Sequence, residues 1–446
     1  MSKEPIIINA PASKSLSHRT LIAAALANRV SEISSVLDSD DITRTRDCLT
    51  ACGATIAEKA GNLVVSGMES GPKGGNADRK HKKDAPHELF MHESGTTCRL
   101  MTAVAAAGHG TFLVHGAPRM HERPMAELVK ALKKLGASFE FKEKDGHLPF
   151  VMTCKGYTGK KVEISLEESS QYLSGLLLGA PLASHETTIT VTGKKAVSWP
   201  YVALTLRIME DFKAGFDVQI KDGKQWESVP WRSVKAVTPG TIRFIVKPTG
   251  YDSTDYQVEG DWSNASYFLA AGAIGRRPVL IKGLAADSLQ GDRAIMDILS
   301  QMGASIKVSF DGILVEPGSL HGITVDMGRC PDLVPTVATV AAFASTPTTI
   351  TNVAHLRLKE TDRLKACALE ISRTQTQTEI VDDSLIIRPS RVPNGHCINF
   401  DTYGDHRMAM AMSLFQLGGI DVILDNPGCV NKSFPGFWDE WKKIIG

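Results

Sequence analysis

The chain has 446 residues, of which 43% are hydrophobic and 22% are charged, and its formal net charge is +1. This length exceeds one ordinary hydrophobic core, so we expect two globular domains. The balanced charge excludes a nucleic-acid binder driven by bulk electrostatics. No segment reaches the roughly 18 consecutive apolar residues that a membrane-spanning helix needs.

The first predicted helix begins at Lys14 and runs to about Asn28, and its first turns are rich in polar side chains. They belong to the stretch from Pro11 to Arg19 (PASKSLSHR). A helix N-terminus offers unpaired backbone N–H groups and the positive end of the helix dipole, and a lysine and an arginine add full charges here. A plain helix cap followed by solvated charges is the alternative, but we favour an anion site.

Two further predicted helices begin with caps rich in Ser and Thr. The stretch from 93 to 100 (ESGTTCRL) opens an Ala-rich helix, and Gly95 lets a ligand approach the backbone closely. Ser169, Ser170 and Gln171 open the other. Each signal is weak alone, but together they indicate helices directed at one anionic site.

An internal repeat recurs at roughly 80-residue intervals, apart from a longer gap in the middle. Residues 49–56, 132–139 and 299–306 each contain the end of a helix, a glycine and a short strand. The glycines (Gly53, Gly136 and Gly303) supply the positive φ that ends a helix. We place degenerate copies at 209–220 and 369–387. Repetition of this unit about six times predicts an α/β protein of stacked βαβ-type units.

Two stretches have the composition of insertions. Residues 71–87 are charged and rich in glycine, so we expect a mobile surface loop. Residues 213–240 are polar and contain two tryptophans, so we expect an elaborated hairpin. The basic run at 79–83 could bind nucleic acid, but the lack of interleaved aromatic residues favours a solvated loop.

Eight cysteines are scattered along the chain without a CxxC motif or a histidine pair at metal-ligand spacing. We therefore expect structural thiols, no metal site and a reducing compartment. The apolar run near the N-terminus is too short for a signal peptide, so we expect a cytoplasmic protein.

Two motifs in the C-terminal half carry candidate acid–base chemistry. The stretches from Leu358 to Arg363 (LKETDR) and from Asp405 to Met410 (DHRMAM) place fixed cations beside carboxylates. Chemistry on a phosphate ester needs such a combination. The alternative is structural: Glu360 could pair with the arginine three residues later along one helix face. We expect His406 to be a buried, hydrogen-bonded histidine rather than a base.

Together these motifs resemble the 5-enolpyruvylshikimate-3-phosphate (EPSP) synthase family of enolpyruvyl transferases, over nearly the whole chain. The motifs that carry the resemblance are PASKSLSHR, LDSDD, SGTTCR, ERP, SSQ, SWPY, VEGDWSNASY, the PD at 331–332, LKETDR, YGDHRMAM and NKSFPGFW. The resemblance implies a two-domain inside-out α/β barrel built from six βαβαββ-type repeats. We expect residues 13–257 to form one domain, residues 1–12 plus 258–446 to form the other, and the active site to lie in the interdomain cleft.

The implied reaction transfers the enolpyruvyl group of phosphoenolpyruvate to the 5-hydroxyl of shikimate 3-phosphate and releases phosphate. It belongs to the shikimate pathway of aromatic amino-acid biosynthesis. The resemblance implies a monomer that needs no metal and no other cofactor, that binds these two small molecules, and that has no nucleic-acid or membrane partner.

The resemblance also implies site residues. Phosphoenolpyruvate would contact Lys14, Gly95, Arg123, Arg363, Arg407 and Lys432. Shikimate 3-phosphate would contact Ser15, Arg19, Ser169, Ser170, Gln171, Ser198, Tyr201, Asp332, His355 and Lys359. Asp332 would abstract or orient the hydroxyl proton, while Glu360, together with Lys14, would serve the methylene carbon. Arginine forks suit a carboxylate and a phosphate because they bind both in a bidentate manner.

This chain departs from the family pattern in a few places. Ala12 stands where the family often has glycine, Glu93-Ser94 where many members have Asn-Ala, and His355 where many carry Asn. These changes bear on substrate affinity but remove no charge that the chemistry needs. In this family glyphosate competes for the phosphoenolpyruvate site and a methyl group at Gly95 excludes it, so we expect a glyphosate-sensitive enzyme.

Two other functions compete with this interpretation. The related transferase that acts on UDP-N-acetylglucosamine usually carries a reactive cysteine before its Arg-Pro, but the loop at 116–124 (GAPRMHERP) has none. Its pattern also has Lys-Asn where this chain has Lys14-Ser15. The second is a catalytically silent binding relative, which would not need the intact set of charged residues. A P-loop nucleotide enzyme is excluded because no GxxxxGK[ST] motif occurs.

Overall fold

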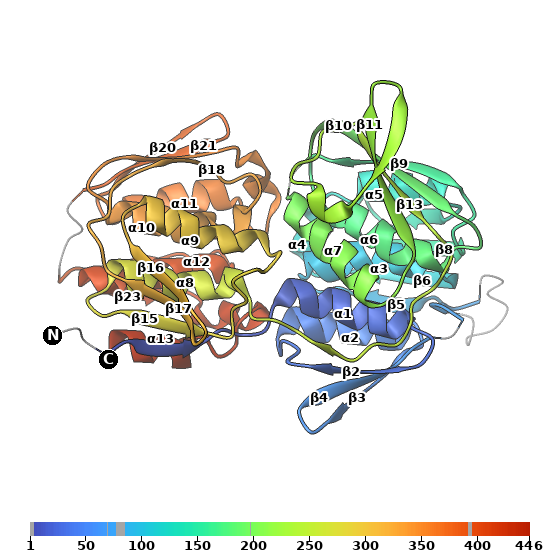
Figure 1. Cartoon of the computed structure of the whole chain (residues 1–446), viewed down its shortest axis with the longest axis horizontal. Coiled ribbons are helices and arrows are strands. Elements are labelled where there is room, and N and C mark those ends of the chain that lie inside the picture. The colour runs from blue at the N-terminus through green and yellow to red at the C-terminus, as the bar shows by residue number, and fades with distance from the viewer. Residues whose placement is uncertain (1–3, 69, 77–84, 197, 391–394) are drawn as a thin grey trace. The chain divides into compact units, whose positions relative to one another are not determined.

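The computed structural model describes residues 4–68, 70–76, 85–196, 198–390 and 395–446. By its contacts the chain divides into two compact units, both of which appear in Figure 1. We call residues 14–37 and 41–258 the first unit, and residues 1–13, 38–40 and 259–446 the second unit.

The described part of the first unit contains three sheets with helices packed on them. Their strand orders are β14-β2-β4-β3, β5-β6-β8-β7 and β12-β11-β13-β10-β9. The strands are β2 (Val30–Ser34), β3 (Thr55–Lys59), β4 (Asn62–Ser66), β5 (His87–Phe90), β6 (His109–His115), β7 (Ser138–Phe141), β8 (Phe150–Lys155), β9 (Lys161–Leu166), β10 (Thr187–Ala196), β11 (Phe216–Asp222), β12 (Gln225–Val229), β13 (Ile242–Val246) and β14 (Tyr256–Gln257). The helices are α1 (Lys14–Leu26), α2 (Asp40–Ala51), α3 (Gly95–Ala106), α4 (Pro118–Glu122), α5 (Ala126–Lys134), α6 (Gln171–Gly179) and α7 (Trp199–Asp211).

The described part of the second unit has the sheets β1-β15-β17-β16, β18-β19-β21-β20 and β22-β23. The strands are β1 (Ile6–Asn9), β15 (Val279–Lys282), β16 (Ser305–Ser309), β17 (Gly312–Glu316), β18 (Thr324–Asp326), β19 (Thr348–Thr351), β20 (Gln377–Val381), β21 (Ser384–Arg388), β22 (Cys397–Phe400) and β23 (Asp421–Leu424). The α-helices are α8 (Trp262–Ile274), α9 (Ile295–Gln301), α10 (Val334–Ala342), α11 (Arg363–Ser372), α12 (His406–Ser413) and α13 (Phe437–Ile445).

The sheets share one topology, in which a parallel pair of strands is extended by an antiparallel hairpin. In the second sheet of the first unit, β5 pairs with β6 in parallel, β6 with β8 antiparallel, and β8 with β7 antiparallel. The sheet of β9 to β13 has the extra strand β12, and β22-β23 consists of the parallel pair alone. The α/β fold predicted from the repeats is confirmed, and the last repeat is shortened.

The glycines predicted to end helices have the expected backbone conformation. The φ angles of Gly53, Gly136 and Gly303 are 109°, 105° and 105°. Each follows a helix (α2, α5 or α9) and precedes a strand (β3, β7 or β16). In the two degenerate copies the corresponding residues are Lys213, with a φ of 61°, and Gln375, with a φ of 65°. The helix therefore ends with a left-handed residue in these copies too, although that residue is not glycine.

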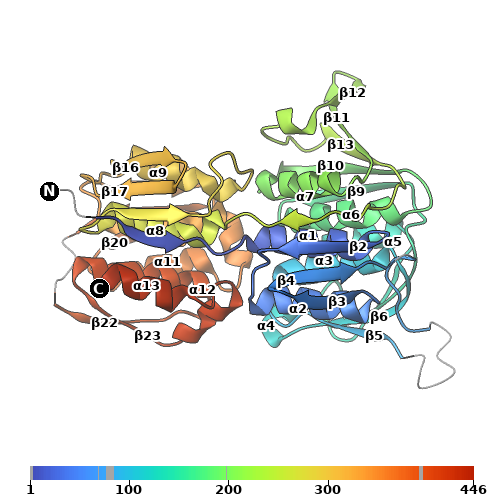
Figure 2. The ribbon, with the colours of Figure 1, turned by 60° about the horizontal axis from the view of Figure 1, so that its bottom comes forward.

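The cores of both units consist of fully buried helices covered by sheets that have one buried face. Every residue from Leu16 to Leu26 in α1, and every residue of α10, is buried. Strands such as β2 and β21 alternate between more buried and more exposed residues. Alanine-rich helices allow close packing, while burial of each large aliphatic side chain contributes about 1.5–3 kcal/mol. In Figure 2 strands form much of the outside of each unit, and α13 also lies at the surface.

The two predicted insertions have different outcomes. The segment at 213–240 contains the antiparallel hairpin of β11 and β12, as predicted. Part of the other segment is not the expected mobile loop, because Gly74 and Gly75 donate backbone hydrogen bonds to the carbonyls of His109 and Thr111 on β6. A Cβ at Gly75 would lie 1.9 Å from the carbonyl oxygen of Ala85, so this pairing requires glycine. Residues 77–84, with the basic run at 79–83, lie outside the described residues.

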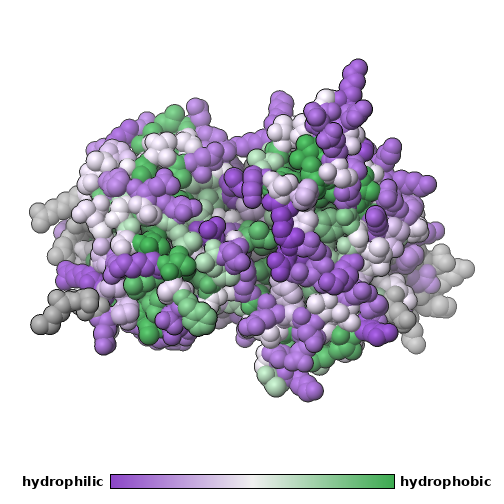
Figure 3. Space-filling view, in the orientation of Figure 1, coloured by the Kyte–Doolittle hydropathy of each residue, from purple (hydrophilic) through white to green (hydrophobic). Residues whose placement is uncertain are grey.

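The thiols and the surface have ordinary structural features. All eight cysteines are free, six of them are buried, and burial raises the pKa of the Cys98 thiol to about 11. Among the described residues, no helix is both long and apolar enough to span a membrane. The face in Figure 3 shows hydrophilic residues interspersed with small apolar areas.

Candidate active site

Arg19, in the first unit, is a buried positive charge whose partners are neutral oxygen atoms. Its Nε donates to Thr205 Oγ1 at 2.8 Å, and its Nη1 donates to the carbonyl of Ser15 at 2.8 Å. Its Nη2 donates to the Tyr201 carbonyl at 3.1 Å and lies 3.4 Å from Ser174 Oγ. Burial lowers the pKa of Arg19 to about 10, so the guanidinium stays charged at neutral pH. No carboxylate pairs with it in the described part of the chain, which makes it a candidate anion ligand.

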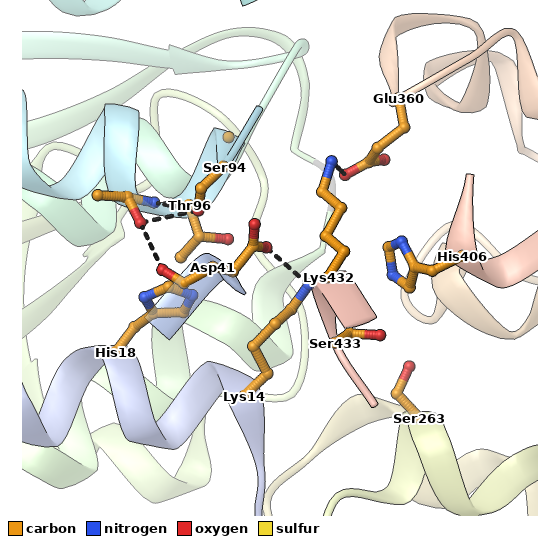
Figure 4. Close-up of polar contacts among 12 residues, drawn as sticks. Lys14, His18, Asp41, Ser94, Thr96, Ser263, Glu360, His406, Lys432 and Ser433 are labelled. Carbon is orange, nitrogen blue, oxygen red and sulfur yellow. Dashed lines mark hydrogen bonds and ion pairs between the residues drawn. The ribbon is translucent and has the colours of Figure 1, made fainter. Parts of the chain in front are cut away.

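Lys14 is the first residue of α1 and pairs with Asp41 near the start of α2. Its Nζ lies 3.2 Å from Asp41 Oδ2, and both side chains are mostly buried. Figure 4 shows Lys14 directed at this carboxylate. Asp41 belongs to the LDSDD motif, to which sequence reasoning assigned no role. Its partnership with Lys14 depends on the packing of two helices, which the motif alone does not reveal.

The predicted helix starts of α3 and α6 lie side by side. Helix α3 begins at Gly95 after the cap Ser94, and α6 begins at Gln171. Gln171 Nε2 donates to Thr96 Oγ1 at 2.9 Å. Arg99 Nη1 donates both to Gln171 Oε1 at 3.1 Å and to the Gly95 carbonyl at 3.2 Å. Two of the three predicted cradles are therefore joined by direct hydrogen bonds.

Gly95 brings the backbone against two guanidinium groups. A Cβ atom at this position would lie 2.6 Å from Arg99 Nη1 and 2.7 Å from both terminal nitrogens of Arg123. Both arginines are largely buried. Their charges add to the positive end of the α3 dipole, so an anion is favoured here. Arg99 was quoted in the sequence motif but was absent from the predicted site, although its place in the first turn was a usable signal.

The serines predicted to bind shikimate 3-phosphate lie at helix starts. Ser170 is the N-cap of α6, and Ser169 Oγ accepts a hydrogen bond from the Gln171 N–H at 3.2 Å. Ser198 is the N-cap of α7 and has a left-handed φ of 56°. Such strained conformations of non-glycine residues cluster at functional sites. Tyr201 lies in the first turn of α7.

In the second unit, Arg363 binds three carboxylates. Its Nε lies 2.7 Å from Asp405 Oδ2 and its Nη2 lies 3.1 Å from Asp405 Oδ1, which makes a bidentate pair. Its Nη1 lies 3.0 Å from Asp332 Oδ1, and its Nη2 lies 2.7 Å from Glu360 Oε2. The side chain is almost fully buried. The LKETDR and DHRMAM motifs therefore meet at this guanidinium.

Asp332 lies among cations. Arg407 Nη2 contacts its Oδ2 at 3.1 Å, and Lys359 Nζ lies 3.6 Å from its Oδ1. Burial by itself would raise the pKa of the Asp332 carboxyl, but Arg407, Lys359 and Arg363 outweigh it and hold that pKa well below its ordinary value. Arg407 also donates to Ser263 Oγ, which fixes its orientation. Asp332 is therefore an ionised hydrogen-bond acceptor at neutral pH.

Glu360 lies between two cations. Its Oε2 contacts Arg363, and its Oε1 lies 3.7 Å from Lys432 Nζ, the pair shown in Figure 4. Lys432 ends the short 3-10 helix η8 (Pro427–Lys432) and is 7% exposed. The structural alternative, a pair between Glu360 and Arg363, is present. Arg363 also contacts the carboxylates of Asp332 and Asp405, so its pair with Glu360 is part of a larger charged cluster. The presence of this pair therefore does not argue against a catalytic role for Glu360.

Asp292 is a buried carboxyl that sequence reasoning did not single out. It lies in the 3-10 helix η4 (Gly291–Ala294). Burial and the charge of Asp332 raise its pKa to about 7, against the lowering effects of Arg407 and a hydrogen bond with Ser263. A carboxyl of this kind can hold a proton near neutral pH, which is a property of catalytic acids.

Two buried histidines, His355 and His406, also lie in the second unit. His355, in the 3-10 helix η6 (Ala354–Leu358), is 7% exposed, and Lys359 follows that helix directly. The predicted burial of His406 is confirmed, but its Nδ1 lies 3.7 Å from Asp405 Oδ1, too far for the hydrogen bond that was also expected. Within the second unit, the predicted residues Asp332, Glu360, Arg363, Arg407, Lys359 and Lys432 form one connected cluster.

Comparisons with known proteins agree on one family. Residues 5–441 match the model of the family described as EPSP synthase (3-phosphoshikimate 1-carboxyvinyltransferase). The 3-phosphoshikimate 1-carboxyvinyltransferase of Aeromonas salmonicida is 38% identical over 440 residues, which cover 98% of this chain and 96% of that protein. That of Haemophilus influenzae is 38% identical over 442 residues, with the same coverage. The EPSP synthase structure from Acinetobacter baumannii has a TM-score of 0.73 at 24% identity, covering 98% of this chain and 95% of that one, which shows a shared fold.

Proposed function

This chain belongs to the EPSP synthase family. We propose that some of its charged residues bind the anionic substrates of one reaction and that others transfer the protons. The reaction moves the enolpyruvyl group of phosphoenolpyruvate to the 5-hydroxyl of shikimate 3-phosphate and releases phosphate, in aromatic amino-acid biosynthesis. The observation that carries the division of roles is Asp332, which lies between Arg407 and Arg363 in one cluster with Glu360.

The reaction sets the proton requirements. A proton must add to the methylene carbon of phosphoenolpyruvate while the 5-hydroxyl, losing its own proton, bonds to the adjacent carbon. In the second step the phosphate oxygen leaves that carbon and a proton leaves the new methyl group, which restores the double bond. The site therefore needs one group for the hydroxyl proton and an acid that later acts as a base at carbon.

We assign the hydroxyl proton to Asp332. It is ionised, its oxygens face cations, and an acceptor of this kind orients a hydroxyl for attack. We assign the carbon proton to Glu360, assisted by Lys14. The contacts of Glu360 with Arg363 and Lys432 support this role, because they fix the carboxyl in place.

We assign phosphoenolpyruvate binding to Lys14, Gly95, Arg123, Arg363, Arg407 and Lys432. A carboxylate and a phosphate require several fixed cations. The approach of two guanidinium groups to Gly95 supports this set and adds Arg99 to it.

We assign shikimate 3-phosphate binding to Ser15, Arg19, Ser169, Ser170, Gln171, Ser198, Tyr201, Asp332, His355 and Lys359. The buried charge of Arg19, held by neutral oxygens, supports an anionic ligand beside α1. The serine caps of α6 and α7 supply the neutral donors that a phosphate or a polyol needs.

The assignments are tested by following two products in one assay. Purified protein is mixed with phosphoenolpyruvate and shikimate 3-phosphate in deuterated water, beside a UDP-N-acetylglucosamine control. We expect phosphate release with shikimate 3-phosphate alone and deuterium in the enolpyruvyl methylene of the product. A Glu360→Gln variant should lose both signals. If it kept near-full turnover, Glu360 would have no part in the mechanism.

We also propose that the enzyme acts as a monomer in the cytoplasm. The six buried, free cysteines support a reducing compartment. Light scattering on the purified protein, at concentrations spanning those in the cell, should give the mass of one chain, 48.2 kDa. Fractionation of the source cells should recover the protein with cytoplasmic markers. A mass of two chains would contradict the monomer, and recovery with a membrane fraction would contradict the cytoplasmic location.

A further inference from the structure

A run of four buried polar side chains joins the starts of three helices in the first unit. His18, on α1, lies with its Nδ1 2.7 Å from Thr45 Oγ1 on α2. Thr45 Oγ1 lies 2.8 Å from Thr97 Oγ1 on α3, which in turn lies 2.7 Å from Ser94 Oγ at the cap of that helix. All four side chains are essentially inaccessible to solvent. His18 and Ser94 are labelled at opposite ends of this run in Figure 4.

The hydrogen positions in this run follow from one carbonyl group. Thr97 Oγ1 also lies 3.2 Å from the backbone oxygen of Asp41, which can only accept a hydrogen bond. The single hydroxyl hydrogen of Thr97 therefore points to Asp41. The hydroxyl groups of Thr45 and Ser94 must then donate to Thr97. Because the hydrogen of Thr45 is used in this way, its oxygen accepts from His18, which must carry a hydrogen on Nδ1.

The other tautomer of His18 is disfavoured on two counts. It would reverse the contacts of Thr45 and Thr97 and leave the Asp41 carbonyl without its bond. It would also place an N–H at Nε2, an atom that is buried and has no hydrogen-bond partner among the described residues. An unsatisfied buried donor costs about 1–3 kcal/mol, and orphaned acceptors are tolerated better than orphaned donors.

The run ends at groups that the proposed phosphoenolpyruvate site uses. Asp41 receives the last hydrogen bond at its carbonyl, and its carboxylate holds Lys14 at 3.2 Å. Ser94 accepts a hydrogen bond from the Thr97 N–H at 3.3 Å and so caps α3, whose first residue is Gly95. Lys14 and Gly95 come from different helices, and this run connects the two helices through a third.

We propose that His18, Thr45 and Thr97 form a one-directional hydrogen-bond relay that positions Lys14 and the Gly95 helix start for phosphoenolpyruvate, with His18 fixed as its neutral Nδ1–H tautomer. The proposal rests on the phosphoenolpyruvate site assigned above. The three residues are positioning residues, because they act on the ligand only through Lys14, Asp41 and the α3 cap.

Burial keeps His18 neutral and the relay in one state. Burial lowers the pKa of His18 to about 3. Asp41 raises that pKa, whereas Lys14 and Arg19 lower it further. The imidazole is therefore neutral throughout the range in which the enzyme can work, and the direction of the relay does not change with pH.

The tautomer is tested by NMR, independently of activity. Protein labelled with 15N at its histidines is titrated from about pH 5 to about pH 9, and long-range 1H–15N spectra are recorded. We expect one imidazole with a protonated Nδ1 and an unprotonated Nε2 whose shifts do not move, and which disappears in His18→Asn. A His18 signal with its hydrogen on Nε2, or one that titrates in this range, would overturn the proposal.

The positioning role is tested by substitutions that keep shape. Thr45→Val removes the central hydroxyl, and we expect the KM for phosphoenolpyruvate to rise about tenfold, as one lost buried hydrogen bond implies. The KM for shikimate 3-phosphate should stay within about twofold. Thr45→Ser should restore the wild-type value. His18→Asn, whose amide N–H can replace Nδ1–H, should bind normally, while His18→Leu should resemble Thr45→Val.

A matched control and a site control separate the outcomes. Thr102→Val removes a buried hydroxyl from the same helix α3, one that bonds to the Cys98 carbonyl at 2.6 Å and to the Cys98 side chain, and should leave both KM values unchanged. Lys14→Met tests the site itself. If Lys14→Met raised the KM for phosphoenolpyruvate while Thr45→Val lowered only the melting temperature, the relay would be structural and the proposal wrong. If neither variant affected that KM, the assigned site would be wrong as well.

Discussion

The charged clusters of the two units are built on different principles. In the second unit, Arg363 and Arg407 are paired with carboxylates at 2.7–3.1 Å. In the first unit, Arg19 and Arg99 are held by hydroxyl, amide and carbonyl oxygens, which carry no net charge. Both clusters are buried, so the difference does not come from exposure to solvent.

This difference indicates a difference in chemistry. A buried arginine held by neutral oxygens keeps its positive charge available for an incoming anion. A buried arginine held by carboxylates instead fixes those carboxylates and lowers their basicity, as it does for Asp332. Lys14, which pairs with the carboxylate of Asp41, is an exception in the first unit, and it is the residue there to which we assign a part in proton transfer. The comparison therefore predicts that substitutions of the carboxylates in the second unit act mainly on kcat, and that substitutions of the arginines in the first unit act mainly on KM.

The largest effect should come from the carboxylates of the second unit. We expect Asp332→Asn and Glu360→Gln each to lower kcat by about 10²–10⁴-fold, since each removes a proton-transfer group while keeping its shape. Stopped-time phosphate release at saturating substrates measures this. Glu379→Gln, which breaks an exposed pair with Arg388 on neighbouring strands, is the control and should be silent. A large rise in KM without a fall in kcat would break the comparison.

The next effect should come from Arg19. Arg19→Gln removes a buried charge but keeps hydrogen-bond donors near Thr205 and the Tyr201 carbonyl. We expect the KM for shikimate 3-phosphate to rise about 10–100-fold, because a hydrogen bond to a charged group is worth about 1.5–3 kcal/mol, and kcat to change much less. Arg207→Gln on the exposed side of α7, where the arginine pairs with Asp211, serves as the control. Equal losses in kcat and KM would show that Arg19 is not simply a binding residue.

A smaller effect is expected at Gly95. The added Cβ of Gly95→Ala would lie 2.6–2.7 Å from Arg99 and Arg123, so the guanidinium groups must move. They are the ends of flexible side chains, so we expect about a tenfold rise in the KM for phosphoenolpyruvate rather than loss of the fold. Inhibition by glyphosate should weaken far more. Inhibition curves of the wild type and the variant at fixed phosphoenolpyruvate measure both. Wild-type activity that resisted millimolar glyphosate would contradict the predicted sensitivity.

Local signals in the sequence predicted much of this molecule. The helix starts at Lys14, Gly95 and Gln171 carry polar caps, and the stops at Gly53 and Gly136 need a positive φ that glycine adopts freely. Both kinds of signal act within a few residues, so they can be recognised without knowledge of the fold. The repeat and the α/β class follow from them.

Contacts between distant segments could not be predicted in this way. Strand β1 pairs in register with β15, so Ile6 faces Val279, and nothing in either strand identifies the other. The buried Glu370 accepts from the Tyr403 hydroxyl at 2.7 Å and from the Asp401 N–H at 3.0 Å, which anchors the turn before Asp405. Arg99 with Gln171, and Asp292 beside Asp332, belong to the same class. These contacts depend on how distant segments pack together, and a sequence pattern within one segment does not reveal that packing.

The smallest expected effect concerns the helix stops, where the two units should behave alike. Lys213 in the first unit and Gln375 in the second adopt a left-handed φ where other repeats have glycine. A non-glycine residue in this conformation costs about 1–2 kcal/mol, and the flexibility of glycine in the unfolded chain costs about 0.5–1 kcal/mol. Lys213→Gly and Gln375→Gly should therefore each stabilise the fold by about 0.5–1 kcal/mol.

The glycine stops themselves provide a second test. Gly136→Ala, whose Cβ would lie 2.2 Å from Thr158 Oγ1, should destabilise the fold more than Gly53→Ala, whose Cβ would meet open space. Urea unfolding of the four variants measures these differences. Unequal gains at 213 and 375 would show that the two units differ in their backbones as well as in their charged clusters.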